Sequence, residues 1–377
     1  MIKPYRILDW WLARKRRKTS RPGAAKGVLV IAAGGLGDTV LFAHVAERFR
    51  ALARKDEPVT VLLRSDAMKV AFLLPPGVEA RGIDFGRLRR SLGYRRRITD
   101  ELFRAHYRLV VHADYLRHPD LDEALVAAAM APEAAAMEPR PWAKYDAALG
   151  RNRSLYTRLY DSGGRHVDKV LRWAAFADWL AGKPSPPPKA VLSPDRLAAP
   201  AGERTVVMQP FSAVRQKQSP PALYRRLIEA LPALVPPGTP VIVAGGPGDL
   251  EANPEFKTLL DLPGVRFDGS SFAEIVPLLR AARLVVSVDT ALMHLAVAVG
   301  APTLCLASAA FVGEIVPYAP AIAPANARFV YHSMPCEGCL GACVLPAENG
   351  MYPCVARLDE ERIMTAMKEL LAEARPR

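Results

Sequence analysis

The sequence contains no run of about 18 uncharged apolar residues, the length that a membrane-spanning helix requires. We therefore expect no transmembrane helix. A secretory signal is also missing, because the Lys and Arg residues near the N-terminus follow the apolar residues instead of preceding them. These two absences lead us to expect a cytoplasmic protein.

Aromatic residues are scarce, at 7% of 377 residues, and no nucleic-acid-binding motif is present. The formal net charge is nevertheless +13, which favours acidic partners such as nucleic acid, an anionic membrane surface or phosphorylated substrates. Without a motif or an aromatic stacking platform, we expect no nucleic acid among the partners. An anionic membrane and phosphorylated molecules remain.

Two familiar nucleotide-binding loops are incomplete in this chain. A buried strand is expected over residues 27–33, and Gly34-Gly35-Leu36-Gly37-Asp38 follows it as a turn. Val40 occupies the third-glycine position of a dinucleotide-binding fingerprint, and no Gly-Lys-Ser/Thr follows as in a P-loop. The loop does offer a carboxylate, Asp38, beside a helix expected over residues 39–54, where it can serve simply as a helix cap.

Strands and helices alternate in both halves of the chain, which predicts parallel sheets covered by helices, the α/β class. At 377 residues two domains are expected, and the proline-rich run from Lys183 to Lys189 is a stiff linker that suits their boundary. The alanine-rich residues 121–138 are expected to be helical. The predicted divisions are an N-terminal arm at 1–24, a domain at 25–182, a linker at 183–202, a domain at 203–355 and a closing helix at 356–377.

The first 20 residues combine large apolar side chains with a basic cluster. The apolar side chains are Tyr5, Ile7, Leu8, Trp10, Trp11 and Leu12, and the basic ones are Arg14, Lys15, Arg16, Arg17 and Lys18. This pattern is typical of a short helix lying on an anionic membrane surface. An arm packed on its own domain, with its Trp residues covering an apolar patch, fits the pattern equally well.

The stretch from residue 284 to 306 predicts a strand, a tight turn, a helix and a second strand. Residues 284–288 are apolar and β-branched, as in a buried parallel strand. Asp289 and Thr290 are natural N-cap residues for a helix over 291–299, which Gly300 ends. A helix that opens at the carboxyl end of a strand presents free N–H groups and a positive dipole end, so this stretch predicts an anion site.

Four cysteines cluster near the C-terminus with the spacing C-x2-C-x3-C-x10-C, namely Cys336, Cys339, Cys343 and Cys354. In a cytosolic protein such a cluster favours thiolate ligation of zinc or iron over disulfides. We therefore expect a structural metal with four sulfur ligands, the alternative being reduced thiols in a loop. Cys305 falls in a predicted strand and is expected to be ordinary core.

Three segments together resemble the heptosyltransferase family of bacterial glycosyltransferases, family 9. Residues 289–296 with Gly300-Ala301-Pro302-Thr303 resemble its signature D-[ST]-G-x-x-H-x-A followed by G-x-P-[TV]. Residues 35–38 are similar to its Gly-Asp loop, and residues 209–220 to its strand-end phosphate segment with K-x-W-P. The order and spacing of the three segments agree over roughly residues 27–355.

The resemblance implies a GT-B fold, two Rossmann-like parallel-sheet domains facing each other across a cleft. It also implies an inverting transfer that needs no metal for catalysis. The C-terminal domain of such enzymes binds a nucleotide sugar, usually ADP-heptose. The N-terminal domain holds the acceptor, usually a phosphorylated glycolipid of the lipopolysaccharide core. An enzyme of this kind is expected at the cytoplasmic face of the inner membrane, with peripheral contact through residues 1–20.

The resemblance also implies roles for individual residues. Asp38 becomes the general base for the acceptor hydroxyl, with Gly35 and Gly37 in the acceptor loop. Lys217 would neutralise phosphate charge, and Ser212 matches a phosphate-side hydroxyl.

The remaining donor-side residues belong to the signature itself. Asp289 and His294 match positions near the ribose and phosphates. The backbone N–H groups expected to face the diphosphate are those of Thr290, Ala291, Leu292 and Met293.

The chain departs from the family pattern at two of these positions. Ala291 replaces the signature glycine, and Ser219 replaces the tryptophan of K-x-W-P. These changes keep open a GT-B binding or assembly protein that has lost turnover. Two further alternatives are a glycosyltransferase with a protein acceptor and a sugar-nucleotide epimerase. The four-cysteine segment also resembles one in several branches of the family, including a protein-modifying branch with an iron-bearing cysteine finger.

Overall fold

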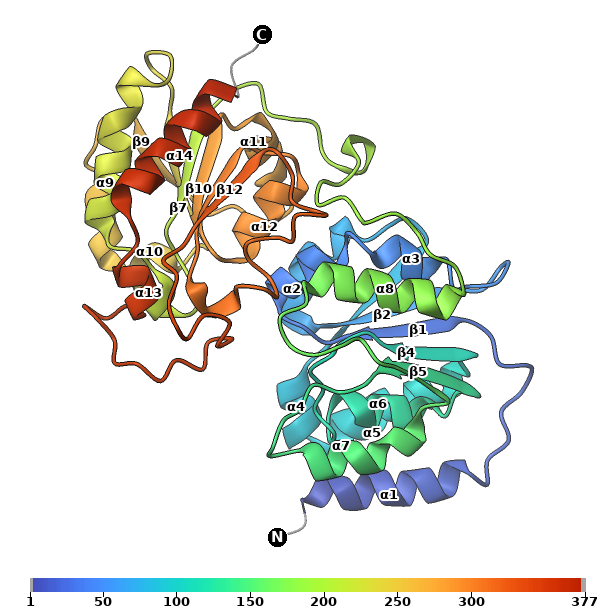
Figure 1. The fold of residues 1–377 in the computed structure, drawn as a ribbon. Coiled ribbons are helices and arrows are strands. Elements are labelled where there is room, and N and C mark those ends of the chain that lie inside the picture. Colours follow the sequence, from blue (N-terminus) through green and yellow to red (C-terminus); the bar gives the residue numbers. More distant parts are fainter. Residues whose placement is uncertain (1–2, 374–377) are drawn as a thin grey trace. The chain divides into compact units, whose positions relative to one another are not determined.

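The computed structural model describes residues 3–373 and divides into two compact units (Figure 1). The first unit runs to Arg165 and includes Arg172–Pro186, and the second comprises His166–Leu171 and the chain from Pro187 onward. Residues 1, 2 and 374–377, at the ends of the predicted arm and closing helix, lie outside the described part. Within the described range, no helix is both long and apolar enough to cross a membrane.

The first unit is built on a six-stranded parallel sheet in the order β3-β2-β1-β4-β5-β6. The strands are β1 Val28–Ala32, β2 Val59–Arg64, β3 Val78–Ile83, β4 Leu109–His112, β5 Glu133–Met137 and β6 Arg158–Tyr160. The helices are α1 Pro4–Arg16, α2 Leu36–Phe42, α3 Ala46–Arg50, α4 Phe85–Arg90, α5 Leu92–Ala105, α6 Asp122–Ala129, α7 Asp146–Asn152 and α8 Lys169–Ala181, of which the part from Arg172 onward belongs to this unit. Apolar side chains on β1 and β4 are fully buried, because both strands lie in the middle of the sheet.

The second unit repeats this plan with a six-stranded parallel sheet in the order β12-β11-β10-β7-β8-β9. The strands are β7 Val206–Gln209, β8 Val241–Ala244, β9 Val265–Asp268, β10 Leu284–Val288, β11 Thr303–Leu306 and β12 Ala327–Val330. The helices are α9 Pro221–Ala230, α10 Asp249–Ala252, α11 Val276–Ala281, α12 Ala291–Ala298, α13 Pro353–Ala356 and α14 Glu360–Glu373. The expected α/β class is confirmed in both units.

Both sheets reverse their strand order at the equivalent place. The reversal lies between β1 and β4 in the first unit and between β7 and β10 in the second. In doubly wound sheets of this kind, ligands bind outside the carboxyl ends of the strands at this reversal point. The topology therefore directs attention to the residues that follow these four strands.

Two predicted helices differ from the structure. The alanine-rich residues 121–138 form α6 and then the strand β5, which pairs with β4 in the sheet interior. The helix propensity of alanine is a weak preference, and the pairing and burial of this segment override it. The helix predicted over 39–54 begins earlier, at Leu36, and is interrupted where His44 and Val45 form i→i+3 turn bonds.

Helix α1 packs on the first unit through one face and exposes another. Tyr5, Leu12 and Arg16 are buried, and the helix contacts α5 and α6. The ion pairs that fasten it join Lys3 and Arg6 to Asp120, Asp9 to Arg95, and Arg16 to Asp100. The arm thus packs on its own unit, while Ile7, Trp10 and Trp11 stay 59%, 64% and 47% exposed.

Helix α8 closes the opposite part of the first unit's core. The Trp173 indole N–H donates to the carbonyl of Ala113 at 2.9 Å, and its ring meets Phe42 edge-on with centroids 5.5 Å apart. Trp173 is almost fully buried. This helix therefore completes the hydrophobic layer that the preceding residues of the unit leave open.

Candidate functional site

The predicted anion site lies where β10 meets α12. Val285, Val286 and Val288 are fully buried, since β10 pairs with β7 on one side and β11 on the other. Thr290 is the N-cap residue in extended conformation, but its side chain makes no capping hydrogen bond. The N–H groups of the first turn of α12 have no intrahelical acceptor and are not taken by that side chain, so they can serve an anion.

Ala291 opens α12 without backbone strain. Ala291 is not one of the described residues with a positive φ. This position therefore does not need the conformational freedom of glycine. The departure from the family signature therefore adds one methyl group at the start of the helix and leaves its backbone unaltered.

Lys217 and Asp289 form a buried ion pair beside this helix start. Lys217 follows β7 and Asp289 follows β10, and their Nζ and Oδ2 atoms are 2.9 Å apart. The ammonium also donates to the Asp289 carbonyl at 2.6 Å, and the Ser308 hydroxyl donates to the carboxylate at 3.1 Å. Burial raises the pKa of Asp289, although Lys217 and Ser308 act in the opposite direction.

The charge of Lys217 is therefore largely balanced within the protein. The resemblance assigns this lysine to the phosphates directly, whereas in the structure it binds the residue immediately before Thr290. Its contact with Asp289 fixes the start of α12, and with it the orientation of the N–H groups.

Gln209 links the two strand ends and is a site residue that the sequence interpretation did not select. Its Oε1 accepts hydrogen bonds from Ser287 at 2.7 Å and Thr290 at 3.1 Å. Its amide nitrogen donates to the carbonyl of Phe211 at 2.7 Å. The available signal was a polar residue at the end of an apolar strand.

Ser212 and His294 are both engaged in local contacts. The Ser212 hydroxyl accepts from the N–H of Val214 at 3.2 Å, so its own O–H can still donate. His294 is buried, with Nδ1 2.7 Å from the Tyr318 hydroxyl and the two rings stacked. Burial raises the pKa of Tyr318 well above its usual range, so this phenol stays protonated.

The glycine loop of the first unit places Asp38 at the reversal point. Asp38 lies in the first turn of α2, and its Oδ2 accepts the N–H of Gly35 at 2.7 Å. The position that sterically requires glycine is Gly34, where a Cβ would lie 2.6 Å from the Cβ of Asp38. Gly35 has more room, since a Cβ there would be 3.6 Å from the Asp38 carboxylate.

The same turn occurs in the second unit with the sequence Gly245-Gly246-Pro247-Gly248-Asp249. There the Asp249 carboxylate accepts the N–H of Gly246 at 2.6 Å. The hydrogen bond of Asp38 is therefore a property of the Gly-Gly-x-Gly-Asp turn, as the capping interpretation predicts. What distinguishes Asp38 is its location, because its loop follows a strand at the reversal point and the other loop does not.

Asp114 anchors the beginning of the glycine loop and was not selected from the sequence. It follows β4, the neighbour of β1, and its Oδ2 accepts the N–H of Ala33 at 2.6 Å. Its own N–H donates to Nδ1 of His112 at 3.2 Å, and the residue is buried. Two carboxylates thus hold the loop, one at Ala33 and one at Gly35.

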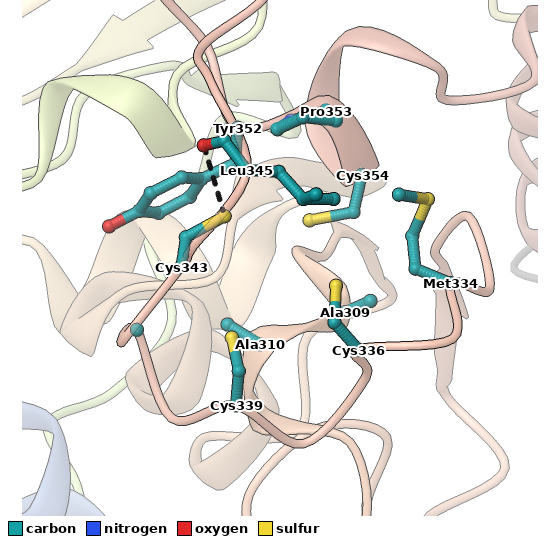
Figure 2. Close-up of a pocket in the computed structure, with 11 residues that line it drawn as sticks. Ala309, Ala310, Met334, Cys336, Cys339, Cys343, Leu345, Tyr352, Pro353 and Cys354 are labelled. Atoms are coloured by element: carbon teal, nitrogen blue, oxygen red, sulfur yellow. Dashed lines mark hydrogen bonds between the residues drawn. The ribbon is translucent and has the colours of Figure 1, made fainter.

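The four clustered cysteines line one pocket in the second unit (Figure 2). Figure 2 shows the four sulfur atoms around the same hollow. Burial raises the pKa of Cys354, and the other three cysteines raise it further. Within residues 3–373, no group of three or more His, Cys, Asp or Glu side chains is already arranged as a metal site. Cys305 is buried in β11, as expected for core.

The two units have the doubly wound parallel-sheet architecture of the GT-B fold. The model of glycosyltransferase family 9 (heptosyltransferase) matches residues 120–333, more than half of the chain, and the chain belongs to this family. Among curated proteins no sequence matches the chain.

Solved structures share the fold over nearly the whole chain. The family 9 glycosyl transferase from Veillonella parvula DSM 2008 has a TM-score of 0.67 and 17% identity, covering 94% of this chain and 100% of that chain. The E. coli heptosyltransferase WaaC, solved with ADP, has a TM-score of 0.63 and 18% identity, covering 92% and 98%. The E. coli ADP-heptose LPS heptosyltransferase II has a TM-score of 0.62 and 18% identity, covering 92% and 99%.

Proposed function

We propose that this chain transfers a heptose or related sugar, with inversion and without a catalytic metal, from ADP-heptose to a lipopolysaccharide-core or other surface-glycan acceptor. The observation that carries the proposal is the start of α12, whose N–H groups are left uncapped beside the Lys217–Asp289 pair at the reversal point. The family supports the identity of the donor, as does the similar fold of the E. coli ADP-heptose LPS heptosyltransferase II.

The second unit supplies the donor site in this proposal. The diphosphate would accept hydrogen bonds from the first-turn N–H groups of Ala291, Leu292 and Met293, where the helix dipole also favours negative charge. The O–H group of Ser212, which follows β7, provides a further donor, because its oxygen accepts from Val214 and its hydrogen can still be donated. These groups stabilise the charge that the diphosphate gains as it leaves.

The first unit supplies the base. Asp38 would take the proton of an acceptor hydroxyl, whose oxygen forms a bond to the anomeric carbon. The attack comes from the face opposite the diphosphate, and the bond from that carbon to the diphosphate oxygen breaks with its electron pair leaving on ADP. The configuration at the anomeric carbon therefore inverts. A phosphorylated glycolipid acceptor suits the basic charge of the chain.

Transfer of labelled heptose from ADP-heptose to extracted lipopolysaccharide core tests this function. Asp38→Asn should retain ADP binding in calorimetry and lose transfer. The matched control is Asp249→Asn, which makes the same change in the corresponding turn of the second unit and should keep transfer. Unchanged transfer by Asp38→Asn would refute the base assignment.

The same assay separates the alternatives. Binding of the sugar nucleotide without transfer to any acceptor would identify a protein that has lost turnover. Product formed without an acceptor would identify an epimerase. Transfer to a polypeptide instead of a glycolipid would identify a protein-modifying enzyme.

We further propose that Cys336, Cys339, Cys343 and Cys354 hold a structural zinc or iron ion. Four soft sulfur donors around one hollow suit either metal, and bound metal would tie the ends of this loop-rich segment together. Elemental analysis of protein purified without added metal should give about one ion per chain. Cys336→Ser should lose it and Cys305→Ser, in the core, should keep it. Metal-free native protein would refute the site.

We also propose peripheral attachment to the cytoplasmic face of the inner membrane through residues 1–20. The exposed Ile7, Trp10 and Trp11 lie on one side of α1, next to a basic last turn. Replacing both Trp residues by Ser should reduce co-sedimentation with anionic liposomes. Leu116→Ser removes an apolar side chain that is 47% exposed, as Trp11 is, and should have no effect. Equal binding by all three proteins would refute attachment through α1.

A further inference from the structure

Phe311 contacts the ammonium group at the centre of the donor site. Its ring centroid is 4.8 Å from Nζ of Lys217, within the range of a cation–π interaction. Phe311 ends the short 3₁₀ segment η7, Ala309–Phe311, which follows Ser308. The hydroxyl of Ser308 donates to the Asp289 carboxylate, so this short stretch contacts both members of the buried ion pair.

The segment from Met334 to Cys354, here called the cysteine segment, holds η7 in place. The N–H of Gly338 donates to the carbonyl of Ala309 at 2.9 Å, and that of Leu340 donates to Ala310 at 2.7 Å. Ala309 and Ala310 also line the pocket of the four cysteines, as Figure 2 shows. The cysteine segment therefore forms hydrogen bonds to the backbone that presents Phe311.

The cysteine segment also contacts the backbone next to Lys217. The N–H of Tyr352 donates to the carbonyl of Gln216, the residue before Lys217, at 2.9 Å. The lysine is thus fixed at its backbone through Gln216 and at its ammonium end through Phe311. Both contacts come from elements that the cysteine pocket joins.

We propose that Phe311 is a positioning residue of the donor site, which holds the Lys217 ammonium on Asp289, and that the cysteine segment sets its place through η7. A lysine side chain has many rotamers, and both oxygens that contact the ammonium here belong to one residue, Asp289. The aromatic face of Phe311 supplies a second contact with a charged group in a mostly dry environment. The proposal rests on the proposed function only in naming the diphosphate as the ligand.

One consequence is coupling between the cysteine pocket and the donor site. If filling the pocket orders η7, metal binding and ADP binding must strengthen each other by the same factor, because such linkage is reciprocal. Phe311→Leu should remove the coupling while leaving both ligand sites in place.

The direct test is the rate at which Lys217 reacts with acetic anhydride in the folded full-length chain, measured by mass spectrometry of its peptides. Phe311→Leu should speed acetylation of Lys217 about three- to tenfold, since the cation–π contact is lost. Phe311→Tyr keeps an aromatic face and should restore the native rate. Phe311→Met repeats the test with another side-chain volume, in case the leucine variant folds poorly.

Two controls report on changes elsewhere in the second unit. Lys257, which is half-exposed and paired with Glu251, should react equally in all proteins. Val344→Ser alters the most exposed of the large hydrophobic side chains described, at 87%, within the cysteine segment, and should leave Lys217 unaffected. Equal Lys217 rates in the native, leucine and methionine proteins would overturn the proposal.

ADP affinity is the second readout. Phe311→Leu should weaken ADP binding several-fold in calorimetry, and Phe311→Tyr should not. If the native protein binds no ADP while the Lys217 rates follow the expected pattern, the proposed donor is wrong and the positioning role stands. If ADP binds and neither readout responds to Phe311→Leu, the positioning role is wrong and the donor stands.

Discussion

The Nζ atom of Lys217 lies 2.9 Å from Oδ2 of Asp289, and both side chains are buried. The two residues follow neighbouring strands of one sheet, 72 positions apart in sequence. A pair of this kind contributes little net stability as a unit, but either member left alone is an uncompensated buried charge.

Replacing one member of the pair should therefore lower the stability of the second unit. We expect Lys217→Met to lower the free energy of unfolding of the second unit by about 3–5 kcal/mol. In the double variant with Asp289→Leu, much of this loss should be recovered. The stabilities of the single and double variants can be measured by urea denaturation, monitored by circular dichroism. Additive losses in the double variant would contradict the pairing.

The Lys217→Met variant should also show a characteristic pH dependence. Burial raises the pKa of Asp289 in the native protein, and loss of the lysine removes the main effect that opposes this. The folded state then binds a proton that the unfolded state releases, so stability should fall as pH rises from the ordinary aspartate range through the raised pKa. Stability of this variant that rises over the same interval would contradict the buried position of Asp289.

Gly34→Ala should impair catalysis without affecting donor binding. The new Cβ would lie 2.6 Å from the Cβ of Asp38, so the loop or the carboxylate must move. We expect a fall in kcat of at least about tenfold with unchanged ADP affinity, because small displacements of a base are costly. Gly93→Ala, at a helix position where a Cβ meets nothing within 4 Å, is the matched control and should retain full activity.

Asp114→Ala should act on the same loop from its other end. The N–H of Ala33 would lose its acceptor in a half-buried position, at a cost of about 1 kcal/mol in stability. Asp114→Asn keeps a carbonyl oxygen that can accept this hydrogen bond, so it should retain more activity than the alanine variant. Equal activity of the two variants would show that the bond to Ala33 does not position the loop.

The lowered pKa of Glu57 should make the stability of the first unit sensitive to acid. Its hydrogen bonds with Arg108 lower the pKa of the carboxyl from 4.5 to about 2. A lowered folded-state pKa means that the stabilisation is present above the ordinary glutamate pKa and is lost as pH falls toward about 2. We expect Glu57→Gln to cost about 2 kcal/mol at pH 7 and to flatten the acid limb of the stability curve. An acid limb identical to that of the native protein would contradict this assignment.

The sequence predicted those parts of the fold that local pattern determines. The strands β10 and β11 and the helix between them were expected within a residue of their observed ends, because β-branched runs, cap residues and Gly300 mark each boundary. The alanine-rich strand β5 was missed, since its state depends on pairing with β4 and not on its own composition.

The same division applies to the site. Asp38, Lys217 and the start of α12 were selected because they occur in recognisable motifs, and their roles in the reaction stay predictions. Gln209, Asp114 and Phe311 could not, because each acts through contacts with residues distant in sequence: Thr290, Ala33 and Lys217, respectively. Their roles depend on which strand ends lie side by side, and only the topology decides that.

The order in which the chain passes between the two units limits how the protein can be divided. Residues 166–171 belong to the second unit, and the chain then returns to the first before leaving it again after Pro186. A fragment that stops at Arg165 would lack Trp173, leaving the Ala113 carbonyl without its indole donor and the ring of Phe42 uncovered. During synthesis, the first unit can close only after six residues of the second have already been made.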